Sequence, residues 1–318
     1  MRSVHTQKIS DWTVLAYLFI ALVPAGTRAQ TNSGPGASAE WKQVETALGR
    51  AGKLQPGDVY KFGMPRTDMQ VTVDGTLISA PLALGSWLAF KRMGGQVMVM
   101  GDLVLSEGEV EPVMLKLQQG GIEQTALHNH LLHESPRVMY MHIAARGDAV
   151  QLATALHDAL ALTKTPLPAG AASPNSAAAG PERIDTAKIE SILGFSGKDA
   201  GGVFQFSIPR LEKIEDDGME IPPTMGTATA INFQPTGSGR AVITGDFVLV
   251  ASEVNPVIRA LREHGIEVTA IHSHMLTEQP RLFFMHFWAN DDAVKLATGL
   301  RAALDQTKSA SGDMRDVK

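Results

Sequence analysis

One histidine-rich phrase occurs twice in this sequence, once in each half. Residues 126–142 and 270–286 each contain His-x-His, a Glu four residues after the second His, a Pro-Arg pair and a closing Met-His pair. Imidazole and carboxylate groups bind Zn, Fe, Mn, Ni and Cu ions in proteins, and the chain has no cysteine that could supply a thiolate. The candidate metal ligands are His128, His130, Glu134 and His142 in the first copy and His272, His274, Glu278 and His286 in the second.

The phrase is expected to lie on two neighbouring strands. Side chains alternate across a strand, so His128 and His130 point to the same face. Antiparallel pairing with the returning strand can bring His142 to that face, and Glu134 lies in the connecting turn, from which its carboxylate can fold back. The second copy repeats this arrangement. The spacing therefore predicts a divalent transition-metal site in one or both copies, with zinc as the first choice and the glutamate as ligand or general base.

Two other interpretations of these histidines stay open. A strand histidine can be a satisfied core residue, with one ring nitrogen donating and the other accepting, and a duplication copies such residues without any demand from chemistry. The histidines can also line a polar ligand pocket that holds no metal. His133, whose counterpart is Thr277, is expected in an exposed turn, and His157, which aligns with Arg301 on a helix, is expected to face solvent.

Two further pairs of residues recur in both halves. Arg137 and Arg281 follow the turn proline and can bind a ligand carboxylate or phosphate through two guanidinium nitrogens, although pairing with the glutamate of the same copy is slightly favoured. Asp102 and Asp246 each follow a glycine at the start of an expected strand. Because Gly-Asp pairs are frequent in turns, we expect turn residues there rather than distant ligands.

The recurrence extends over most of the chain and indicates an internal duplication. Residues 100–163 overlay residues 244–307 without a gap at roughly half identity, whereas the preceding hairpin region needs a one-residue shift near Phe90 and Phe233. A stretch rich in Pro, Ala and Gly separates the halves. The expected segments are a signal peptide at 1–29, a flexible lead-in at 30–39, repeat domains at 40–163 and 183–308, a linker at 164–182 and a disordered tail at 309–318.

The first residues have the pattern of a secretory signal. A basic start, an apolar run from Trp12 to Val23, breakers at Pro24 and Gly26 and a small residue at Ala29 suit cleavage by signal peptidase. The apolar run is shorter than the roughly 20 residues that span a bilayer. We therefore expect a periplasmic or secreted protein that keeps no transmembrane anchor after cleavage.

Each half predicts an α+β domain. In the second half, strand, helix, strand, strand and helix signals follow one another, with Ser252 as a plausible helix N-cap and Asp291 or Asp292 opening the last helix. This is the β-α-β-β-α core of a ferredoxin-like unit with an antiparallel sheet and an added hairpin region upstream. Helices at Glu40–Arg50 and Asp185–Gly194 precede the sheets. One sheet face stays available for a ligand, the duplicate domain or a second subunit.

Composition limits the partners. The formal charge of −5 and the pI near 6.1 exclude the basic surface that nucleic-acid binding needs. Neither a glycine-rich phosphate loop, nor a Gly-x-Ser-x-Gly elbow, nor a His-Glu-x-x-His helix occurs in the sequence. A small molecule or a cell-envelope component remains as the partner.

Two resemblances accompany these motifs. The His-x-His-x3-Glu spacing is similar to the first cupin motif, which in that family binds a catalytic metal, but the last histidine follows the glutamate by only eight residues here. From about residue 40 to 308, including Gly-Asp-Phe-Val-Leu and Glu-Val-Asn-Pro-Val, the chain resembles the LppY/LpqO-like family of exported bacterial proteins. That resemblance implies an exported, duplicated protein and no assured activity.

The sequence thus predicts an exported metal-binding protein that can be a metal-dependent hydrolase. The alternative is a non-catalytic protein that binds an envelope glycan or a small anion. It would use Arg137 and Arg281 together with nearby aromatic side chains.

Overall fold

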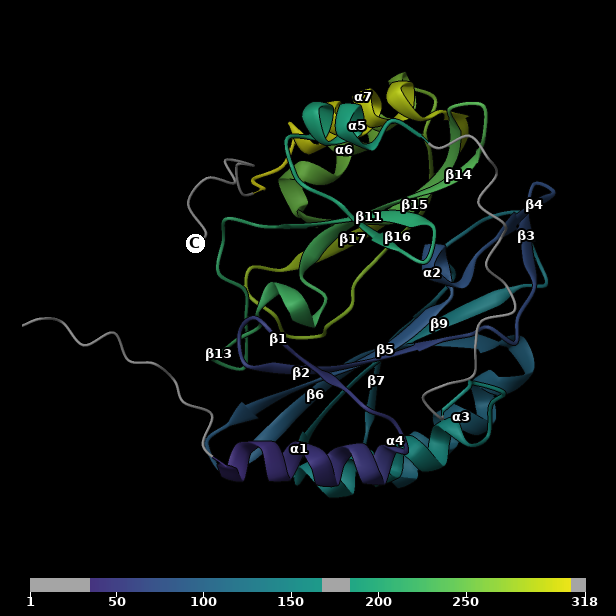
Figure 1. Cartoon of the computed structure of the whole chain (residues 1–318). Coiled ribbons are helices and arrows are strands. Elements are labelled where there is room, and N and C mark those ends of the chain that lie inside the picture. The colour runs from purple at the N-terminus through teal and green to yellow at the C-terminus, as the bar shows by residue number, and fades with distance from the viewer. Residues whose placement is uncertain (1–34, 168–183, 310–318) are drawn as a thin grey trace, which may run out of the picture.

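The computed structural model describes residues 35–167 and 184–309, which form two domains of one architecture. The two sheets face each other across the middle of the molecule, and the long helices cover the two outer faces (Figure 1). Within the described ranges, no helix is long and apolar enough to cross a membrane. The predicted signal peptide, nearly all of the linker and almost the whole tail lie outside the described residues.

The first domain begins with a helix and alternates strands and helices thereafter. Its elements are α1 (Pro35–Leu48), β1 (Lys53–Gln55), β2 (Val59–Pro65), β3 (Val71–Val73), β4 (Thr76–Ile78), α2 (Ala80–Ala83), β5 (Gly85–Met93), β6 (Gln96–Ser106), α3 (Glu107–Gln119), β7 (Glu123–His128), β8 (Glu134–Ser135), β9 (Val138–Gly147) and α4 (Ala149–Leu160).

The second domain repeats this order with small changes in its hairpin region. Its elements are α5 (Thr186–Leu193), β10 (Lys198–Ala200), β11 (Val203–Pro209), β12 (Glu215–Asp216), β13 (Met219–Glu220), the 3-10 helix η1 (Pro223–Met225), β14 (Ala228–Gly237), β15 (Arg240–Val250), α6 (Ala251–Glu263), β16 (Glu267–His272), β17 (Leu282–Asp292) and α7 (Ala293–Leu304).

The sheet topology confirms the predicted α+β class with duplicated domains. Each large sheet is antiparallel, in the order β1-β2-β5-β6-β9-β7 and, equivalently, β10-β11-β14-β15-β17-β16. Strand β9 lies between β6 and the edge strand β7, which is the strand arrangement of the β-α-β-β-α unit. The hairpin strands extend this core on one side. Because both sheets are open and covered by helices, the similarity to cupins does not extend to a barrel.

The pairing registers confirm the predicted one-residue shift between the halves. Tyr60 pairs with Phe90 in the first sheet, and its counterpart Phe204 pairs with Phe233 in the second. The residue numbers of Tyr60 and Phe204 differ by 144, whereas those of their partners Phe90 and Phe233 differ by 143. The offset returns to 144 at Val99 and Ile243, so a missing residue before β14 is compensated by an extra one in the β14–β15 hairpin, where the pairing is irregular between Pro235 and Gly237.

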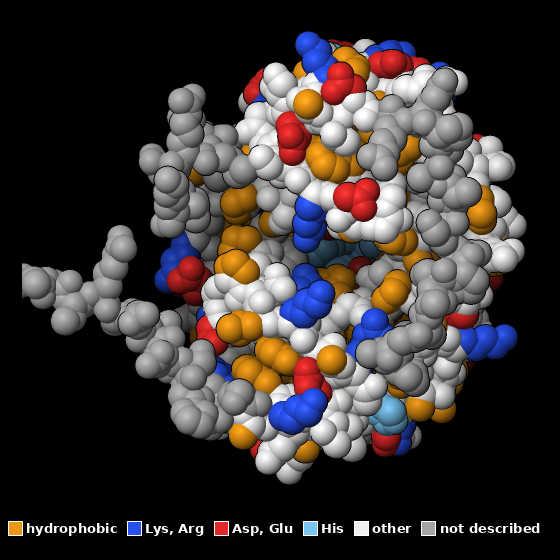
Figure 2. Space-filling view, in the orientation of Figure 1, with side chains coloured by type: hydrophobic (Ala, Val, Ile, Leu, Met, Phe, Trp, Pro, Cys, Tyr) orange, Lys and Arg blue, Asp and Glu red, His pale blue; other side chains and the backbone are white. Residues whose placement is uncertain are grey.

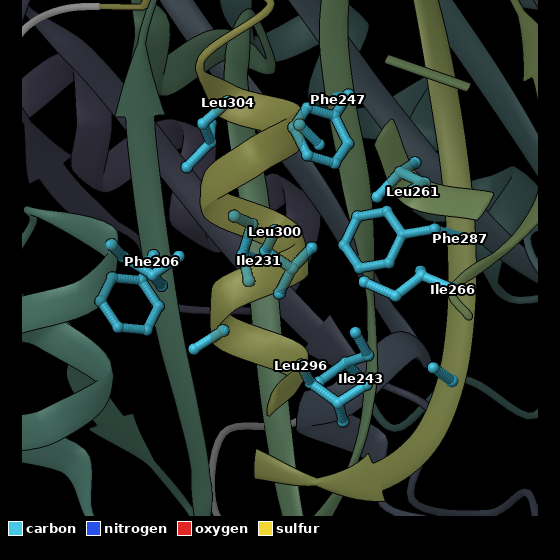
Figure 3. Packing of buried hydrophobic residues seen from close by; sticks show 14 of the residues in the cluster. Phe206, Ile231, Ile243, Phe247, Leu261, Ile266, Phe287, Leu296, Leu300 and Leu304 are labelled. Carbon is cyan, nitrogen blue, oxygen red and sulfur yellow. The ribbon is translucent and has the colours of Figure 1, made fainter. Parts of the chain in front are cut away.

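Strand alternation divides each sheet between two cores. In β15, Ile243 and Phe247 point to the helices, where they pack with Phe206, Phe287 and Leu300 (Figure 3). The intervening residues point to the other domain. Since both faces are buried, the strands are almost continuously apolar, and the polar residues on the inner faces stand out.

The helix boundaries agree in part with the sequence signals. Asp292 caps α7 by accepting from Lys295 N at 2.8 Å, as predicted. Ser252 is not an N-cap: it lies inside α6, where Glu253 instead accepts from Val250 N at 2.9 Å. Helix α1 begins at Pro35, inside the segment predicted to be a flexible lead-in.

His157 does not simply face solvent, as the sequence suggested. Its Nδ1 lies 3.1 Å from the carbonyl oxygen of Leu48 at the end of α1. Its counterpart Arg301 donates through Nη1 to the carbonyl oxygen of Leu193 at the end of α5, at 2.6 Å. Both side chains thus bind an otherwise unpaired helix carbonyl, which ties the first helix of each domain to the last.

Gly245 allows β14 and β15 to approach closely. A Cβ at this position would lie 2.0 Å from the carbonyl oxygen of Ala230, a backbone atom that cannot swing aside. We expect Gly245→Ala to lower the free energy of unfolding by about 1–3 kcal/mol in urea titrations, because the strands must separate. Gly63→Ala is the control, since a Cβ there meets nothing within 4 Å. Equal stability of the two variants would contradict this expectation.

Candidate metal centre between the two domains

The six histidines that occur in both copies of the phrase meet between the sheets. Each ring of one domain stacks on a ring of the other. The ring-centroid distances are 3.5 Å for His128–His272, 3.8 Å for His130–His286 and 3.7 Å for His142–His274. The copies predicted as two separate sites therefore form one shared cluster, which we call the histidine centre.

The histidine centre has approximate two-fold symmetry. Thr125 Oγ1 donates to the carbonyl oxygen of His274 at 2.6 Å, and its counterpart Thr269 donates to that of His130 at 2.6 Å. His130 also stacks on Tyr140, and His274 on Phe284, with centroids 3.3 and 3.4 Å apart. These contacts hold each His-x-His segment against both domains.

Strand pairing places the histidines on the predicted common face. His142 on β9 lies opposite Ala126 on β7 and Asp102 on β6, while His286 on β17 lies opposite Ala270 and Asp246. Pairing and alternation place His128 with His142, and His272 with His286, on the inner face, whereas His130 and His274 lie just beyond the ends of β7 and β16. The predicted convergence of the three imidazoles of each copy is confirmed, although one of the three follows the strand rather than lying on it.

Every one of these histidines has a ring nitrogen available. In each ring Nε2 is buried and has no hydrogen-bond partner among the described residues. Three of the Nδ1 atoms face backbone carbonyl oxygens. His286 Nδ1 lies 2.8 Å from the oxygen of Gly245, His128 Nδ1 lies 3.2 Å from that of Asn129, and His272 Nδ1 lies 3.4 Å from that of Ser273. Because a carbonyl only accepts, these Nδ1 atoms carry the hydrogen and leave the Nε2 lone pair free.

Burial keeps the rings neutral. Desolvation lowers the pKa of His128 to about 4 and that of His272 to about 3. The pKa values of the other four fall well below the ordinary value, mainly through desolvation and then through neighbouring histidines. Neutral imidazole is the form that binds metal ions, so no proton has to leave at neutral pH.

Two groups of ligand atoms are close enough to hold a metal. His128 belongs to both groups. The first group adds His272, His274 and His286, and the second adds His130 and His142. Within each group the atoms lie within 4.8 Å of one another. Nitrogen ligands at about 2.0–2.1 Å from a metal lie within roughly 4.2 Å of each other, so a small inward movement completes either group.

Asp102 and Asp246 belong to the histidine centre, and the prediction that they are turn residues is wrong. Both lie in mid-strand. Asp246 Oδ2 is 3.3 Å from His274 Nε2, and Asp102 Oδ2 is 3.8 Å from His130 Nε2. The Oδ1 atom of each has no partner among the described residues. The useful signal was an aspartate inside a run of apolar residues buried on both faces.

The two aspartates are strongly perturbed by burial. Desolvation raises the pKa of Asp102 to about 7, while the cation of Lys61 opposes this rise. Desolvation, and then the charge of Asp102, raise the pKa of Asp246 well above its usual range. A buried carboxylate without a cation is unfavourable, so this pair fits residues that face a positive ion.

The structure does not bring Glu134 and Glu278 to the histidine centre. Glu134 Oε1 accepts from Val138 N at 3.0 Å, and Glu278 Oε1 accepts from Leu282 N at 2.9 Å. The glutamates therefore brace the turns before the returning strands and join neither ligand group. Burial raises the pKa of Glu134 to about 7. The predicted role as ligand or base fails because the turn folds onto its own backbone.

The arginines of the phrase also lie away from the site. Arg281 donates through Nη1 to Glu278 Oε2 at 3.1 Å and to two turn carbonyls, which is the structural pairing favoured from the sequence. Arg137 is exposed, and its Nη1 is 4.0 Å from Glu107 rather than paired with Glu134. His133 lies in an exposed turn at a φ of 57°, as predicted.

A cavity of about 840 Å³ opens onto the histidine centre. Figure 2 shows a hollow between the two halves, with histidine atoms at its floor and Lys and Arg side chains around it. Its lining includes His130, His142, His274 and His286 with both aspartates, and the basic residues Arg50, Lys53, Lys61 and Lys198. Four of the six histidines are thus reachable by a small molecule, although their Nε2 atoms are buried.

These features define a duplicated α+β protein with a histidine and carboxylate centre between its domains. The family model described as Domain of Unknown Function (DUF1259) matches residues 42–162 and again residues 187–306. The chain belongs to this family and contains its domain twice. Both matched regions coincide with the two structural domains.

Other comparisons add little. No curated protein matches the chain. Among solved structures, it is similar to a trimeric bacterial microcompartment shell protein, PduB, at 11% identity over 83% of this chain and 96% of that chain, with a TM-score of 0.19. EtuB from Clostridium kluyveri shares 9% identity over 80% of this chain and 88% of that chain, with a TM-score of 0.20. At such scores neither likeness supports an argument.

Proposed function

We propose that this protein binds divalent transition-metal ions, zinc first, at the histidine centre. The observation that carries the proposal is that all six histidines present a buried Nε2 without a partner among the described residues. Satisfied core histidines would have both ring nitrogens in hydrogen bonds. A purely structural role therefore leaves these atoms unexplained, whereas metal coordination uses each of them.

The number of donors favours two ions. Six imidazoles and the unpartnered Oδ1 atoms of Asp102 and Asp246 exceed the ligands of one four- to six-coordinate ion. The approximate symmetry divides them equally, with three histidines and one aspartate from each domain. His128 and His272 lie at the axis, where either ring can serve both ions.

A hydrolase is the activity that such a centre supports best. Zinc with an open coordination position lowers the pKa of bound water to about 7 and polarises a carbonyl or phosphoryl oxygen. The cavity leaves one side of the centre accessible to a substrate. The six histidines would hold the ions, and one of the two aspartates, Asp102 or Asp246, would be the carboxylate that accepts a proton there if it is not itself a ligand.

The non-catalytic alternative is less well supported in its original form. It assigned ligand binding to Arg137 and Arg281, and neither residue lines the cavity. Binding of an anion or envelope glycan would have to use other side chains.

We also propose that the protein acts in the periplasm or outside the cell. The support is the signal-like pattern of residues 1–29 and the resemblance to the exported LppY/LpqO-like family. The absence of cysteine suits an oxidising compartment, in which free thiols are easily oxidised.

Metal loading tests the central proposal. Protein stripped with a chelator and titrated with zinc is expected to bind about two ions per chain by elemental analysis. A zinc concentration 100-fold above the dissociation constant should stabilise the fold by about 2.7 kcal/mol for each site, seen as a higher melting temperature that chelator reverses. Calcium at the same concentration is the control, because it prefers oxygen ligands. Absence of stoichiometric binding with Zn, Cu, Ni, Mn and Fe would refute the proposal.

A further inference from the structure

The cavity above the histidine centre is basic in an otherwise acidic chain. The protein has a net charge of −5, yet four basic residues line this space. The acidic residues in its lining are Asp102 and Asp246, at the histidine centre itself. If metal ions neutralise these aspartates, the remaining field in the cavity is positive. Such a space concentrates anions.

Lys61 is the most strongly held cation in the cavity. It lies on β2 and points between the domains, with Nζ 4.3 Å from the centre of the Trp87 ring. Nζ donates to the carbonyl oxygen of Thr224 in the other domain at 2.9 Å. An ammonium has three donors, so this bond leaves others for a ligand. The position of Lys61 is thus set by both domains.

Lys61 and Trp87 are specific to the first domain, unlike the histidines. The counterpart of Lys61 in the second domain is Gln205, which donates to the carbonyl oxygen of Pro81 at 2.8 Å. Trp87 pairs with Asp102, and the residue that pairs in the same way with Asp246 is Ala230. Duplication alone therefore does not account for the lysine and the tryptophan. They make the two walls of a nearly symmetric cavity chemically different.

A second lysine faces the same space. Lys198 on β10 lies opposite Gln205 in the sheet and lines the cavity. Two point charges from opposite domains, together with metal ions at the floor, suit a group that carries two negative charges on several oxygens. A phosphoryl group has this charge and shape. The volume of about 840 Å³ also leaves room for the rest of a small molecule.

We infer that the cavity binds a phosphate ester, with its phosphoryl group between the histidine centre and Lys61 and its organic part against Trp87. The metal contact in this inference rests on the proposed function, whereas the lysine and tryptophan contacts do not. Lys198 supplies the second positive charge from the opposite wall.

Titration with inorganic phosphate by calorimetry tests the inference on full-length, zinc-loaded protein freed of excess metal. The test variant is Lys61→Gln, because the second domain already carries glutamine at the equivalent position of the same fold. We expect at least a tenfold weaker phosphate affinity, with unchanged zinc content and melting temperature. Lys116→Met is the matched control, since Lys116 pairs with Asp158 on the helical face at 3.2 Å and should leave the affinity unchanged.

The outcomes separate the two proposals. Full zinc content without phosphate binding, or with equal affinity in Lys61→Gln, overturns the phosphate-ester inference and leaves the metal proposal intact. Absence of zinc binding overturns the proposed function instead. In that case the metal-free protein is titrated with phosphate. Binding that is weaker in Lys61→Gln supports the lysine site, and absence of phosphate binding overturns that site as well.

Discussion

Replacing His128 and His272 together with alanine is expected to remove stoichiometric zinc from the protein. These rings lie at the axis of the histidine centre with centroids 3.5 Å apart, and His128 belongs to both ligand groups. Loss of residues that merely orient a ligand weakens metal affinity by about 10–100-fold, so loss of two direct ligands should exceed 100-fold. Elemental analysis after dialysis, and a zinc-dependent rise in melting temperature that disappears, measure this effect.

Two control variants separate this outcome from general damage. His133→Asn changes an exposed turn histidine from the same phrase, and asparagine tolerates its positive φ. Glu278→Gln changes the turn glutamate that would be a ligand in a cupin-like arrangement. Both are expected to retain full zinc content. Zinc retained by the double alanine variant, or lost from His133→Asn, would contradict the assignment of ligands.

The largest loss of stability is expected from Arg210→Met. Arg210 is buried and donates through Nη1 to the carbonyl oxygen of Val248 and to Glu253 Oε2, both at 2.7 Å, while its Nη2 lies 3.0 Å from Glu212 Oε2. Removing one partner of a buried ion pair leaves a charge without compensation and lowers the free energy of unfolding by about 3–5 kcal/mol. Urea unfolding followed by circular dichroism measures the change.

The same ion pair predicts how stability depends on pH. Burial alone would raise the pKa of Glu253, but hydrogen bonds from Arg210 and from the backbone N–H groups of Val250 and Lys308 lower it overall. The unfolded chain therefore binds a proton at higher pH than the folded chain does. This contribution to stability is present above pH about 4.5 and is lost as the pH falls below it. Arg210→Met should reduce that acid sensitivity.

The control for Arg210→Met is an exposed pair. Lys116→Ala breaks the contact with Asp158 at 3.2 Å and is expected to change stability by about 0–1 kcal/mol, because solvent screens surface ion pairs. Zinc content should stay unchanged in both variants, since neither residue lines the cavity. A loss of stability in Arg210→Met no larger than in Lys116→Ala would contradict the argument.

Much of each domain could be predicted because its signals are local or repeated. Antiparallel pairing and alternation place His128 and His142 on one face whatever the sheet packs against. The duplication showed that one domain architecture serves both halves, and the capping carboxylate of Asp292 marked the start of α7. Each of these statements depends on contacts between residues near in sequence or on a pattern that occurs twice.

The role of the two aspartates could not be read in the same way. A glycine followed by an aspartate is frequent in turns, and this preference outweighed the apolar residues on either side of Asp102 and Asp246. The glycines instead permit close strand approach, as the contact of a Gly245 Cβ with Ala230 shows. The opposite error occurred at Glu134, which the sequence predicts as a metal ligand. Its carboxylate instead accepts a hydrogen bond from the backbone N–H of Val138 and stabilises the turn.

The sequence by itself determined the two domains, their α+β class and the common face of the histidines, because strand alternation and duplication are properties of the chain alone. Only the tertiary structure decided that both copies share one centre. Which face of a sheet meets a partner depends on the packing of many distant apolar side chains, and no local pattern records it. The same packing brought Asp102, Asp246 and Lys61 to the cavity beside the histidines and so determined its chemistry.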